Sequence, residues 1–355
     1  MGYVAVKGGT KAISASVEMY KNKNRVEALE MEISQIKAGM AQMINQIMSE
    51  ASLYDRDLAA LAVKQSEGNM EEAVFLLRAH RSTLPRLYYS TVTNTREMFV
   101  ERRVSASFKD IPGGQILGAS PDFTHRLLDD TMTYSEASFE MTDADSYGYS
   151  LSRLPKVIDY LASEGLLNKV PEDNETPDDI TKQTIEFPSS RSERLQSLTR
   201  GQTGAVTSLG YAEIRGYGYS SHPNIGEVRV GQQPVHIDPF GDGEGYFIGD
   251  VELTEVDAFM PADGDAAEQS KEMEFKIGCG LVFGQNETKA IAMSVLDYSL
   301  SHPVPGVATG DDEFVLLHVD SVESTGFISH LKLPHYVTFQ SVLDRIRKTK
   351  GGTES

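Results

Sequence analysis

The chain contains almost no cysteine: Cys279 is the only one among 355 residues. A single thiol excludes an internal disulfide, a Cys-x-x-Cys zinc site and an iron–sulfur cluster held by this chain alone. Apolar runs long enough to cross a membrane are also missing, and the N-terminus lacks the basic and apolar regions of a signal peptide. We therefore expect a soluble protein of the cytoplasm without a membrane anchor.

Positive charge is scarce as well. The chain has 33 Lys and Arg residues against 52 Asp and Glu residues, which gives a net charge of −19. This balance argues against nucleic-acid binding, because bulk attraction to phosphate needs basic surface. An anionic substrate would need a local basic pocket that overcomes the repulsive field of the whole chain.

The common phosphate- and ion-binding loops are missing too. Residues 8–11 lack the first glycine and the residue order of a Walker A loop. The glycines at 216–218 are followed by Ser221, where a dinucleotide-binding fingerprint needs its third glycine. The glycine-rich run at 241–245 does not have the pattern of a calcium loop. Each of these stretches predicts a turn.

Apolar spacing predicts helices in the first quarter of the chain. Asn69 is a candidate N-cap with Glu72 at the third helical position, after a break at Gly68. A longer amphipathic helix is predicted by apolar residues at helical spacing, namely Ile33, Ile36, Met40, Met43, Ile44 and Ile47. These stripes indicate a packed core, so residues 1–90 are expected to be a mainly helical N-terminal subdomain.

Strand patterns dominate the remainder. Residues 101–118 predict a strand and a Pro-Gly-Gly turn, and valines alternate with charges over 227–230. Further strands are predicted at 3–7, 246–256, 278–284 and 314–319, with Asn286 capping a helix before the last of them. We expect an α+β protein in which the helical subdomain precedes a larger mixed, mainly antiparallel sheet domain. After the helical subdomain, we expect the chain to contain a mixed region with acidic loops at 91–185 and a strand-rich α+β domain at 186–355, which carries the histidine pair.

Two basic islands stand out in this acidic chain. One holds Arg102, Arg103 and Lys109 beside the glycine pair Gly113 and Gly114. The other holds Arg215 within a glycine-rich run, with Arg229 nearby. Guanidinium groups bind phosphate oxygens in pairs, and glycine lets backbone N–H groups approach an anion. These residues are candidate triphosphate contacts; the alternative is an ordinary solvated strand face.

Asp122, His125 and Arg126 place a carboxylate, an imidazole and a guanidinium within five residues. In a buried loop, Asp122 and His125 could carry out acid–base catalysis. On the surface, Asp122 would instead cap the start of a helix. The residues themselves leave both interpretations open.

His330 and His335 lie in the segment Ser-His-Leu-Lys-Leu-Pro-His-Tyr. Neutral imidazole is the commonest ligand for Zn²⁺, and Pro334 keeps the pair off one regular helix face. A turn could bring both rings toward one ion, with further ligands from elsewhere in the chain, from substrate or from a partner. The alternative is two polar residues at the start of a helix, one capping it and one exposed.

An ordered series of segments resembles the I subunit of the bacterial carbon–phosphorus lyase core complex. The resemblance extends from Val4 to about Gln340. It is carried by segments that include Val-Ala-Val-Lys-Gly-Gly at 4–9, Lys-Asp-Ile-Pro-Gly-Gly-Gln at 109–115, Thr-His-Arg-Leu-Leu-Asp at 124–129, Gly-Leu-Val-Phe-Gly at 280–284 and Ser-His-Leu-Lys-Leu-Pro-His-Tyr at 329–336. No common fold would produce this series by chance.

The resemblance implies a role in phosphonate breakdown. It implies that the chain displaces adenine from MgATP by an alkylphosphonate, giving a ribose 1-phosphonate 5-triphosphate, and that alone it acts as a purine nucleosidase. It also implies a zinc ion on His330 and His335 near the radical subunit J, partner subunits G, H, K and L, and paired copies in the complex. One alternative is a scaffold that shares its metal site with the radical subunit. A stand-alone zinc hydrolase is weakened because no H-E-x-x-H motif is present.

Displacement at the ribose carbon would need three kinds of group. The transition state has oxocarbenium character, as in glycoside cleavage. It requires an acid for the departing purine, a carboxylate near the ribose and cations along the triphosphate. His125, Asp122 and the two basic islands are candidates for these parts.

Overall fold

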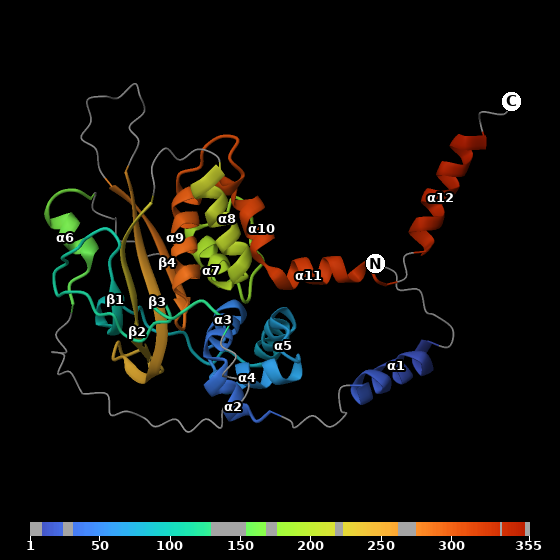
Figure 1. Cartoon of the computed structure of the whole chain (residues 1–355), viewed down its shortest axis with the longest axis horizontal. Coiled ribbons are helices and arrows are strands. Elements are labelled where there is room, and N and C mark those ends of the chain that lie inside the picture. Colours follow the sequence, from blue (N-terminus) through green and yellow to red (C-terminus); the bar gives the residue numbers. More distant parts are fainter. Residues whose placement is uncertain are drawn as a thin grey trace.

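The computed structural model describes residues 9–23, 31–128, 154–167, 176–216, 223–261, 275–333 and 336–351. Figure 1 shows a layer of strands with helices beside it, and a helical cluster that lies below these helices and beside the lower ends of the strands. The helical cluster consists of α2 (Ile33–Gly39), α3 (Ala41–Ala51), α4 (Arg56–Gln65) and α5 (Met70–Thr83). Ile44, Ile47 and Met48 are fully buried inside it. The predicted cap is confirmed, since Asn69 accepts a hydrogen bond from the Glu72 amide at 2.9 Å.

Four antiparallel strands form one sheet in the order β1-β2-β3-β4. The strands are β1 (Phe99–Val104), β2 (Asn224–Ile237), β3 (Tyr246–Pro261) and β4 (Phe275–Phe283). Strand neighbours therefore follow the chain order, even though residues between β1 and β2 form the helices α6 (Val157–Ser163), α7 (Arg191–Arg200) and α8 (Thr203–Gly216). The predicted α+β class is confirmed; the three-part division of the chain stays a prediction.

One face of the sheet is apolar and is covered by α9 (Glu287–Ser301), with α7 (Arg191–Arg200) and α8 (Thr203–Gly216) behind it (Figure 1). Val228, Val256 and Val282 are buried on this face. Gly278 and Gly280 in β4 allow the helix to approach closely, because an added Cβ would lie 2.0 Å from the carbonyl oxygens of Ser294 and Ala290. The strand therefore needs glycine where α9 crosses it.

The opposite face of the sheet is charged yet buried. It is covered by Lys156, by α6 (Val157–Ser163) and by the short 3₁₀ helix η1 (Thr95–Glu97). Arg229 of β2 lies directly across from Glu255 of β3 and forms an ion pair with it. The valine–charge alternation at 227–230 predicted the strand correctly, but its charged side does not face water: Arg229 is 1% exposed.

A polar seam joins the helical cluster to the sheet domain. The Lys289 ammonium group of α9 donates to the Thr199 carbonyl at 2.6 Å and to the Ser49 hydroxyl at 3.4 Å. The buried Glu50 carboxylate accepts hydrogen bonds from the amide and the hydroxyl group of Thr203. Arg78 adds hydrogen bonds to the Glu50 and Arg200 carbonyl oxygens. Buried polar groups of the helical cluster and of the sheet domain thus serve as hydrogen-bond partners for each other across the seam.

The C-terminal part of the chain is helical. After η3 (Ala308–Gly310) come α10 (Asp312–Val319), α11 (Ser321–His330) and α12 (Tyr336–Gly351). The strand predicted at 314–319 is wrong, because these residues belong to α10. A short apolar run fits a buried strand and a buried helix equally well, and Asp311 caps the helix by accepting from the Phe314 amide. The strand predicted at 3–7 lies outside the described residues.

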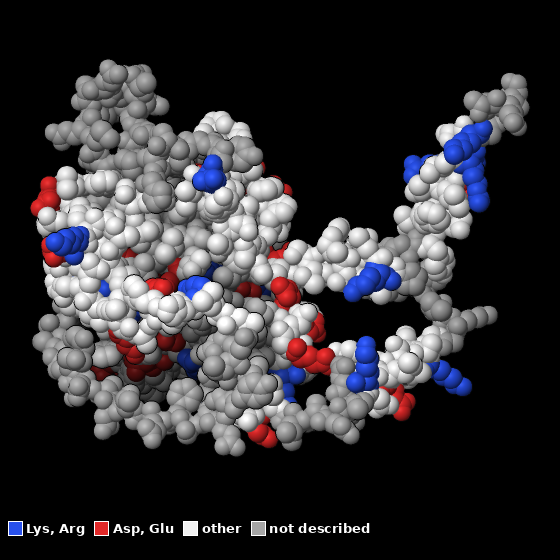
Figure 2. Space-filling model, viewed as in Figure 1, with Lys and Arg blue, Asp and Glu red and all other residues white. Residues whose placement is uncertain are grey.

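Two terminal helices, α1 (Gly9–Lys23) and α12, reach away from the body in Figure 1. No residue of α1 is buried. Figure 2 shows basic side chains along both helices; those of α12 are Arg345, Arg347, Lys348 and Lys350. In the part of the chain that the structure describes, no helix combines the length and the apolar composition needed to cross a bilayer.

Candidate functional site

A pocket of about 290 Å³ opens where β1 and β2 meet the start of α9. Its polar wall contains Arg102, Asp122 and Glu287, with the hydroxyl groups of Ser105 and Thr288 beside them. The remaining wall is apolar and is formed by Val104, Ala106, Ile225, Val228 and Ile291. Two residues predicted from the sequence, Arg102 and Asp122, therefore line one cavity.

Arg102 organises the polar wall. Its side chain is only 4% exposed, and its Nε and Nη2 atoms each lie 2.5 Å from a carboxylate oxygen, of Glu287 and Asp122 respectively. Its Nη1 atom donates to the Leu117 carbonyl oxygen. Hydrogen bonds between ionised groups are short and strong, so Arg102 fixes both carboxylates at the pocket wall.

The two carboxylates differ in their access to solvent. The Asp122 side chain is 45% exposed, whereas the Glu287 side chain is 17% exposed. No helix begins at Asp122 within the described stretch that ends at residue 128, so the alternative interpretation as a helix cap is wrong. His125 is exposed just after the turn that contains Asp122, and it does not line the pocket. Acid–base roles for Asp122 and His125 stay predictions.

Two other arginines of the predicted triphosphate pocket, Arg103 and Arg229, are neutralised by protein groups on the charged face. Arg103 is fully buried and pairs with Glu227 at 2.9 Å. Arg229 pairs with Glu255 at 3.3 Å and donates to the Thr95 carbonyl oxygen. The alternative of a solvated strand face is therefore wrong for both arginines. Their role as triphosphate contacts stays a prediction, although their observed partners are carboxylates and carbonyl groups.

The turn at Gly113 and Gly114 provides hydrogen-bond acceptors for the Arg103 side chain. Gly113 and Gly114 have φ angles of +85° and +77°, which favour glycine. The turn directs carbonyl oxygens toward the guanidinium group: Arg103 Nη1 lies 2.7 Å from the Pro112 oxygen and 3.2 Å from the Gly114 oxygen. The Gly114 amide donates to the Ile111 carbonyl. This orientation suits a cation of the chain rather than a bound phosphate.

Lys109 and Arg215 lie apart from the pocket. Both are exposed, Lys109 before the glycine turn and Arg215 in the last turn of α8. Neither lines the Arg102 pocket. The structure thus does not gather the five cations into one basic cleft within the described residues.

On the charged face, the pKa values of buried titratable groups are shifted by burial and by the charges of their neighbours. Burial lowers the pKa of Lys156, but Asp257 and Glu255 outweigh this effect, so that its pKa is raised overall. Burial also raises the pKa of Asp257. Burial, with Asp257 and Asp297 nearby, raises the pKa of the Cys279 thiol to about 12. Such a thiol stays protonated and unreactive near neutral pH.

His330 is the last residue of α11, and its ring nitrogen Nδ1 contacts the Phe327 carbonyl oxygen. A histidine that donates Nδ1–H to a carbonyl uses Nε2 as its metal ligand. His330 therefore has an orientation that fits half of the predicted zinc pair. His335 lies outside the described residues. Among the residues that are described, three or more His, Cys, Asp or Glu side chains nowhere gather at a metal-binding distance.

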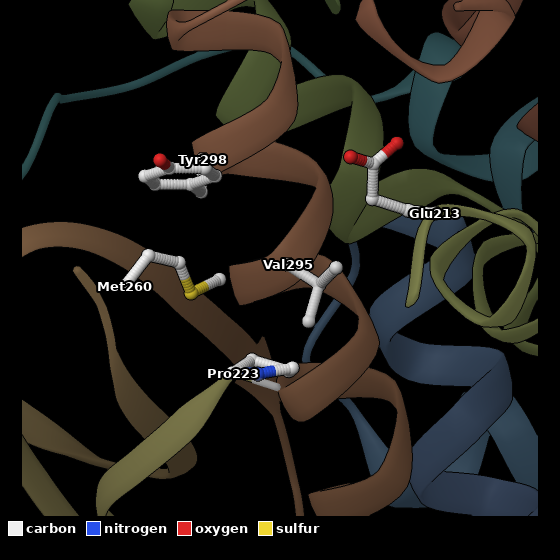
Figure 3. A pocket seen from close by; sticks show the side chains of 5 residues that line it. All are labelled: Glu213, Pro223, Met260, Val295 and Tyr298. Carbon is white, nitrogen blue, oxygen red and sulfur yellow. The ribbon is translucent and has the colours of Figure 1, made fainter. Parts of the chain in front are cut away.

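A second cavity lies between α8, α9 and the start of β2. Figure 3 shows its lining side chains: Glu213, Pro223, Met260, Val295 and Tyr298. Its volume of about 10 Å³ is at the lower limit for one water molecule. Glu213 is engaged there by the Thr309 hydroxyl group. This cavity is therefore a packing defect rather than a ligand site.

Glu287, Thr288 and Ser105 line the larger pocket but were not among the residues selected from the sequence. A glutamate in the first turn of a helix is common because it complements the helix dipole. Its position after Asn286 therefore carried no functional signal. Asn286 occupies the N-cap position of α9 as predicted, but its side chain makes no capping hydrogen bond and donates to the Phe283 carbonyl oxygen instead.

Comparisons with known proteins place the chain in a family. A family model described as "Bacterial phosphonate metabolism protein (PhnI)" matches residues 2–353. One relative, from Escherichia coli strain K12, is 43% identical over 355 residues, which cover 98% of each chain. Another, from Rhizobium meliloti strain 1021, is 41% identical over 358 residues, which cover 98% of this chain and 95% of the relative. Both relatives are named "Alpha-D-ribose 1-methylphosphonate 5-triphosphate synthase subunit PhnI". The resemblance found in the sequence is confirmed: the chain belongs to the PhnI family of bacterial phosphonate metabolism proteins.

Proposed function

We propose that this chain is a subunit of a ribose 1-phosphonate 5-triphosphate synthase that replaces the adenine of MgATP by an alkylphosphonate. The observation that carries the proposal is the identity of 41–43% over 98% of the chain to two subunits named for such a synthase. In the proposed reaction a phosphonate oxygen forms a bond to ribose C1′. The C1′–N9 bond breaks, and adenine leaves with the bonding electrons and takes up a proton. With water as the nucleophile, the same site acts as a purine nucleosidase.

The Arg102 pocket supports this chemistry. A transition state with oxocarbenium character carries positive charge on the sugar, which a nearby carboxylate stabilises. Asp122 is the more exposed of the two carboxylates at the pocket and is fixed by the buried Arg102. We assign the charge-stabilising role to Asp122, and His125, three residues later, is the candidate acid for the departing purine.

Adenine release by the purified full chain tests the proposal. We expect chromatography to detect adenine and ribose triphosphate after incubation with MgATP. Asp122→Asn should lower the rate by about 10²–10³-fold, the usual effect of removing one charge-stabilising group. Asp110→Asn, an exposed carboxylate of the same stretch, serves as the matched control and should leave the rate unchanged. ADP and phosphate as the only products would show a conventional ATPase and contradict the proposal.

We propose further that His330 and His335 hold one Zn²⁺, with the remaining ligands from water, substrate or a neighbouring subunit. The contact between His330 Nδ1 and the Phe327 carbonyl supports this assignment. A bound zinc ion would supply a Lewis acid that binds phosphate or ribose oxygens. His330→Ala should lose zinc in elemental analysis while remaining folded; full zinc content in the double variant with His335→Ala would place the metal elsewhere.

The proposed partners are the G, H, J, K and L subunits, with paired copies of this chain. Large apolar side chains support assembly, because extended apolar surface marks interaction sites. Phe327 is 70% exposed on α11, and Val337 and Phe339 are each 60% exposed on α12. By contrast, the methionine-containing helix α3 packs in the core of this chain, where Met48 is fully buried. Helices α11 and α12 are therefore better candidates than α3 for contact with partners.

A further inference from the structure

We propose that Glu287 and Thr288, at the start of α9, form with Asp122 a subsite for the hydroxyl groups of a ribose ring. The chain would thereby distinguish ribonucleotides from deoxyribonucleotides. The choice of a nucleotide as ligand rests on the proposed function; the preference for hydroxyl groups rests on the pocket itself.

Each carboxylate at the pocket has one oxygen engaged by Arg102. Glu287 uses Oε1 and Asp122 uses Oδ2 for this contact. Neither Glu287 Oε2 nor Asp122 Oδ1 accepts a hydrogen bond from any other described residue. Arg102 donates from Nε and Nη2, which lie on the same edge of its guanidinium group, so the two carboxylates are held side by side. A ligand with two neighbouring donors can therefore satisfy both remaining oxygens at once.

The charge of the wall selects among possible ligands. Two carboxylates and one guanidinium group leave a local net charge of −1, which repels a phosphate group. The positive charge of Arg102 between the carboxylates in turn disfavours a divalent cation. An uncharged group that donates hydrogen bonds fits this wall best, and the neighbouring diol of ribose is such a group. The hydroxyl groups of Thr288 and Ser105 extend the same polar surface.

The shape of the pocket agrees with a sugar. Its volume of about 290 Å³ lies just below the range for drug-sized ligands, about 300–1,000 Å³. The same pocket is also lined by apolar side chains, among them Val104, Val228 and Ile291. A ribose ring has hydroxyl groups on its edge and carbon atoms on its face, so it can contact both walls, while the triphosphate extends outside.

Equilibrium binding of ATP, 2′-deoxyATP and 3′-deoxyATP to the full chain tests the proposal, with recovered ligand checked for released adenine. The wild-type chain should bind ATP about tenfold more tightly than either analogue, the typical effect of one hydrogen bond to a charged group. In Glu287→Gln, ATP affinity should fall to within about threefold of the analogue that lacks the hydroxyl facing Glu287. Gln retains an acceptor for Arg102 Nε, so the fold is preserved.

Glu313→Gln is the matched control, because Glu313 is an exposed glutamate in the first turn of α10. It should keep the wild-type preference for ATP. Thr288→Ala, which leaves the Arg102 contacts intact, should reduce the preference to a smaller extent. Equal binding of ATP and both analogues by the wild type would overturn the subsite, as would an unchanged preference in Glu287→Gln.

The outcomes also separate this subsite from the proposed function. Adenine release without discrimination between ATP and its deoxy analogues would leave the proposed reaction standing and overturn the subsite. Discrimination without adenine release would support a ribonucleotide site and contradict the proposed reaction.

Discussion

Arg102 and Arg103 are neighbours in β1, yet their side chains lie on opposite faces of the sheet, as successive residues of a strand do. Arg103 meets Glu227 on the charged face, where Lys156 and α6 exclude solvent. Arg102 meets Glu287 and Asp122 on the face covered by α9, beside a pocket. Both guanidinium groups are buried and paired, but only one of them holds carboxylates that a ligand can reach.

The difference lies in how completely the carboxylate partners of the two arginines are hydrogen-bonded by the chain. On the charged face Glu227 receives hydrogen bonds from Arg103 and from the Val157 amide, so both of its oxygens are satisfied. At the pocket each carboxylate receives one hydrogen bond from the described chain. A closed ion pair contributes to the integrity of the fold, whereas an incompletely satisfied one offers hydrogen-bonding capacity to a ligand.

Two buried lysines extend the comparison. Lys156, on the charged face, has two carboxylate partners and a raised pKa. Lys289, in α9 on the other side of the sheet, donates to a carbonyl and a hydroxyl group. Burial lowers the pKa of Lys289 to about 8, although Glu50 acts in the opposite direction. Contact with carboxylates thus keeps the pKa of a buried ammonium group high, whereas hydrogen bonds to a carbonyl and a hydroxyl group do not prevent burial from lowering it.

The largest effect on stability is expected on the charged face. Arg103→Ala should lower the free energy of unfolding by about 3–5 kcal/mol, because it leaves the Glu227 carboxylate buried without its cation. Arg96→Ala is the control, since Arg96 pairs with Asp159 at a half-exposed position where such pairs contribute about 0–1 kcal/mol. Urea unfolding at pH 7 measures both. If both variants lost equally little unfolding free energy, water would reach the charged face, and the contrast between the closed Arg103 pair and the open Arg102 pocket would not hold.

A smaller effect, dependent on pH, is expected for Lys289. Its folded pKa of about 8 lies below the unfolded value of 10.5, so the unfolded chain binds more protons between these values. The stability of the wild type should therefore rise with pH relative to Lys289→Met, by up to about 1.4 kcal/mol per pH unit. Unfolding at intervals from pH 7 to about 10 measures this difference.

Lys156→Met provides the comparison for Lys289→Met, because the raised pKa of Lys156 gives stability that is present below the unfolded pKa and lost only at higher pH. The wild type should gain no stability relative to Lys156→Met as the pH rises from 8. Parallel pH profiles for the two lysine variants would break the comparison.

The smallest effects are expected for the two exposed cations. Lys109→Ala and Arg215→Ala should each change the free energy of unfolding by less than about 0.5 kcal/mol, as surface substitutions usually do. ATP affinity, measured on the same preparations, tests their predicted triphosphate contacts separately. A loss of affinity with unchanged stability would support such a contact, and a large loss of stability would contradict their exposed placement.

Local patterns in the sequence predicted where the helices and strands lie. They did not predict which charged side chains of these elements are buried. The cap at Asn69 and the strands around 228–230, 246–256 and 278–284 were predicted because their signals are local. Strand alternation does not reveal whether the polar side faces water or a second layer, so the burial of Arg229 could not be predicted. The partner of Arg102, Glu287, lies 185 positions away along the chain, and no local pattern connects the two.

The polar seam between the helical cluster and the sheet domain limits how the chain can be divided. A fragment that lacks α3 would leave the Lys289 ammonium without Ser49, and the Thr203 amide and hydroxyl without Glu50. The two parts should therefore melt together in one calorimetric transition rather than as independent folding units. Chimeras between family members are expected to tolerate a junction within a surface loop better than an exchange of the helical cluster alone, unless both sides of the seam come from the same parent.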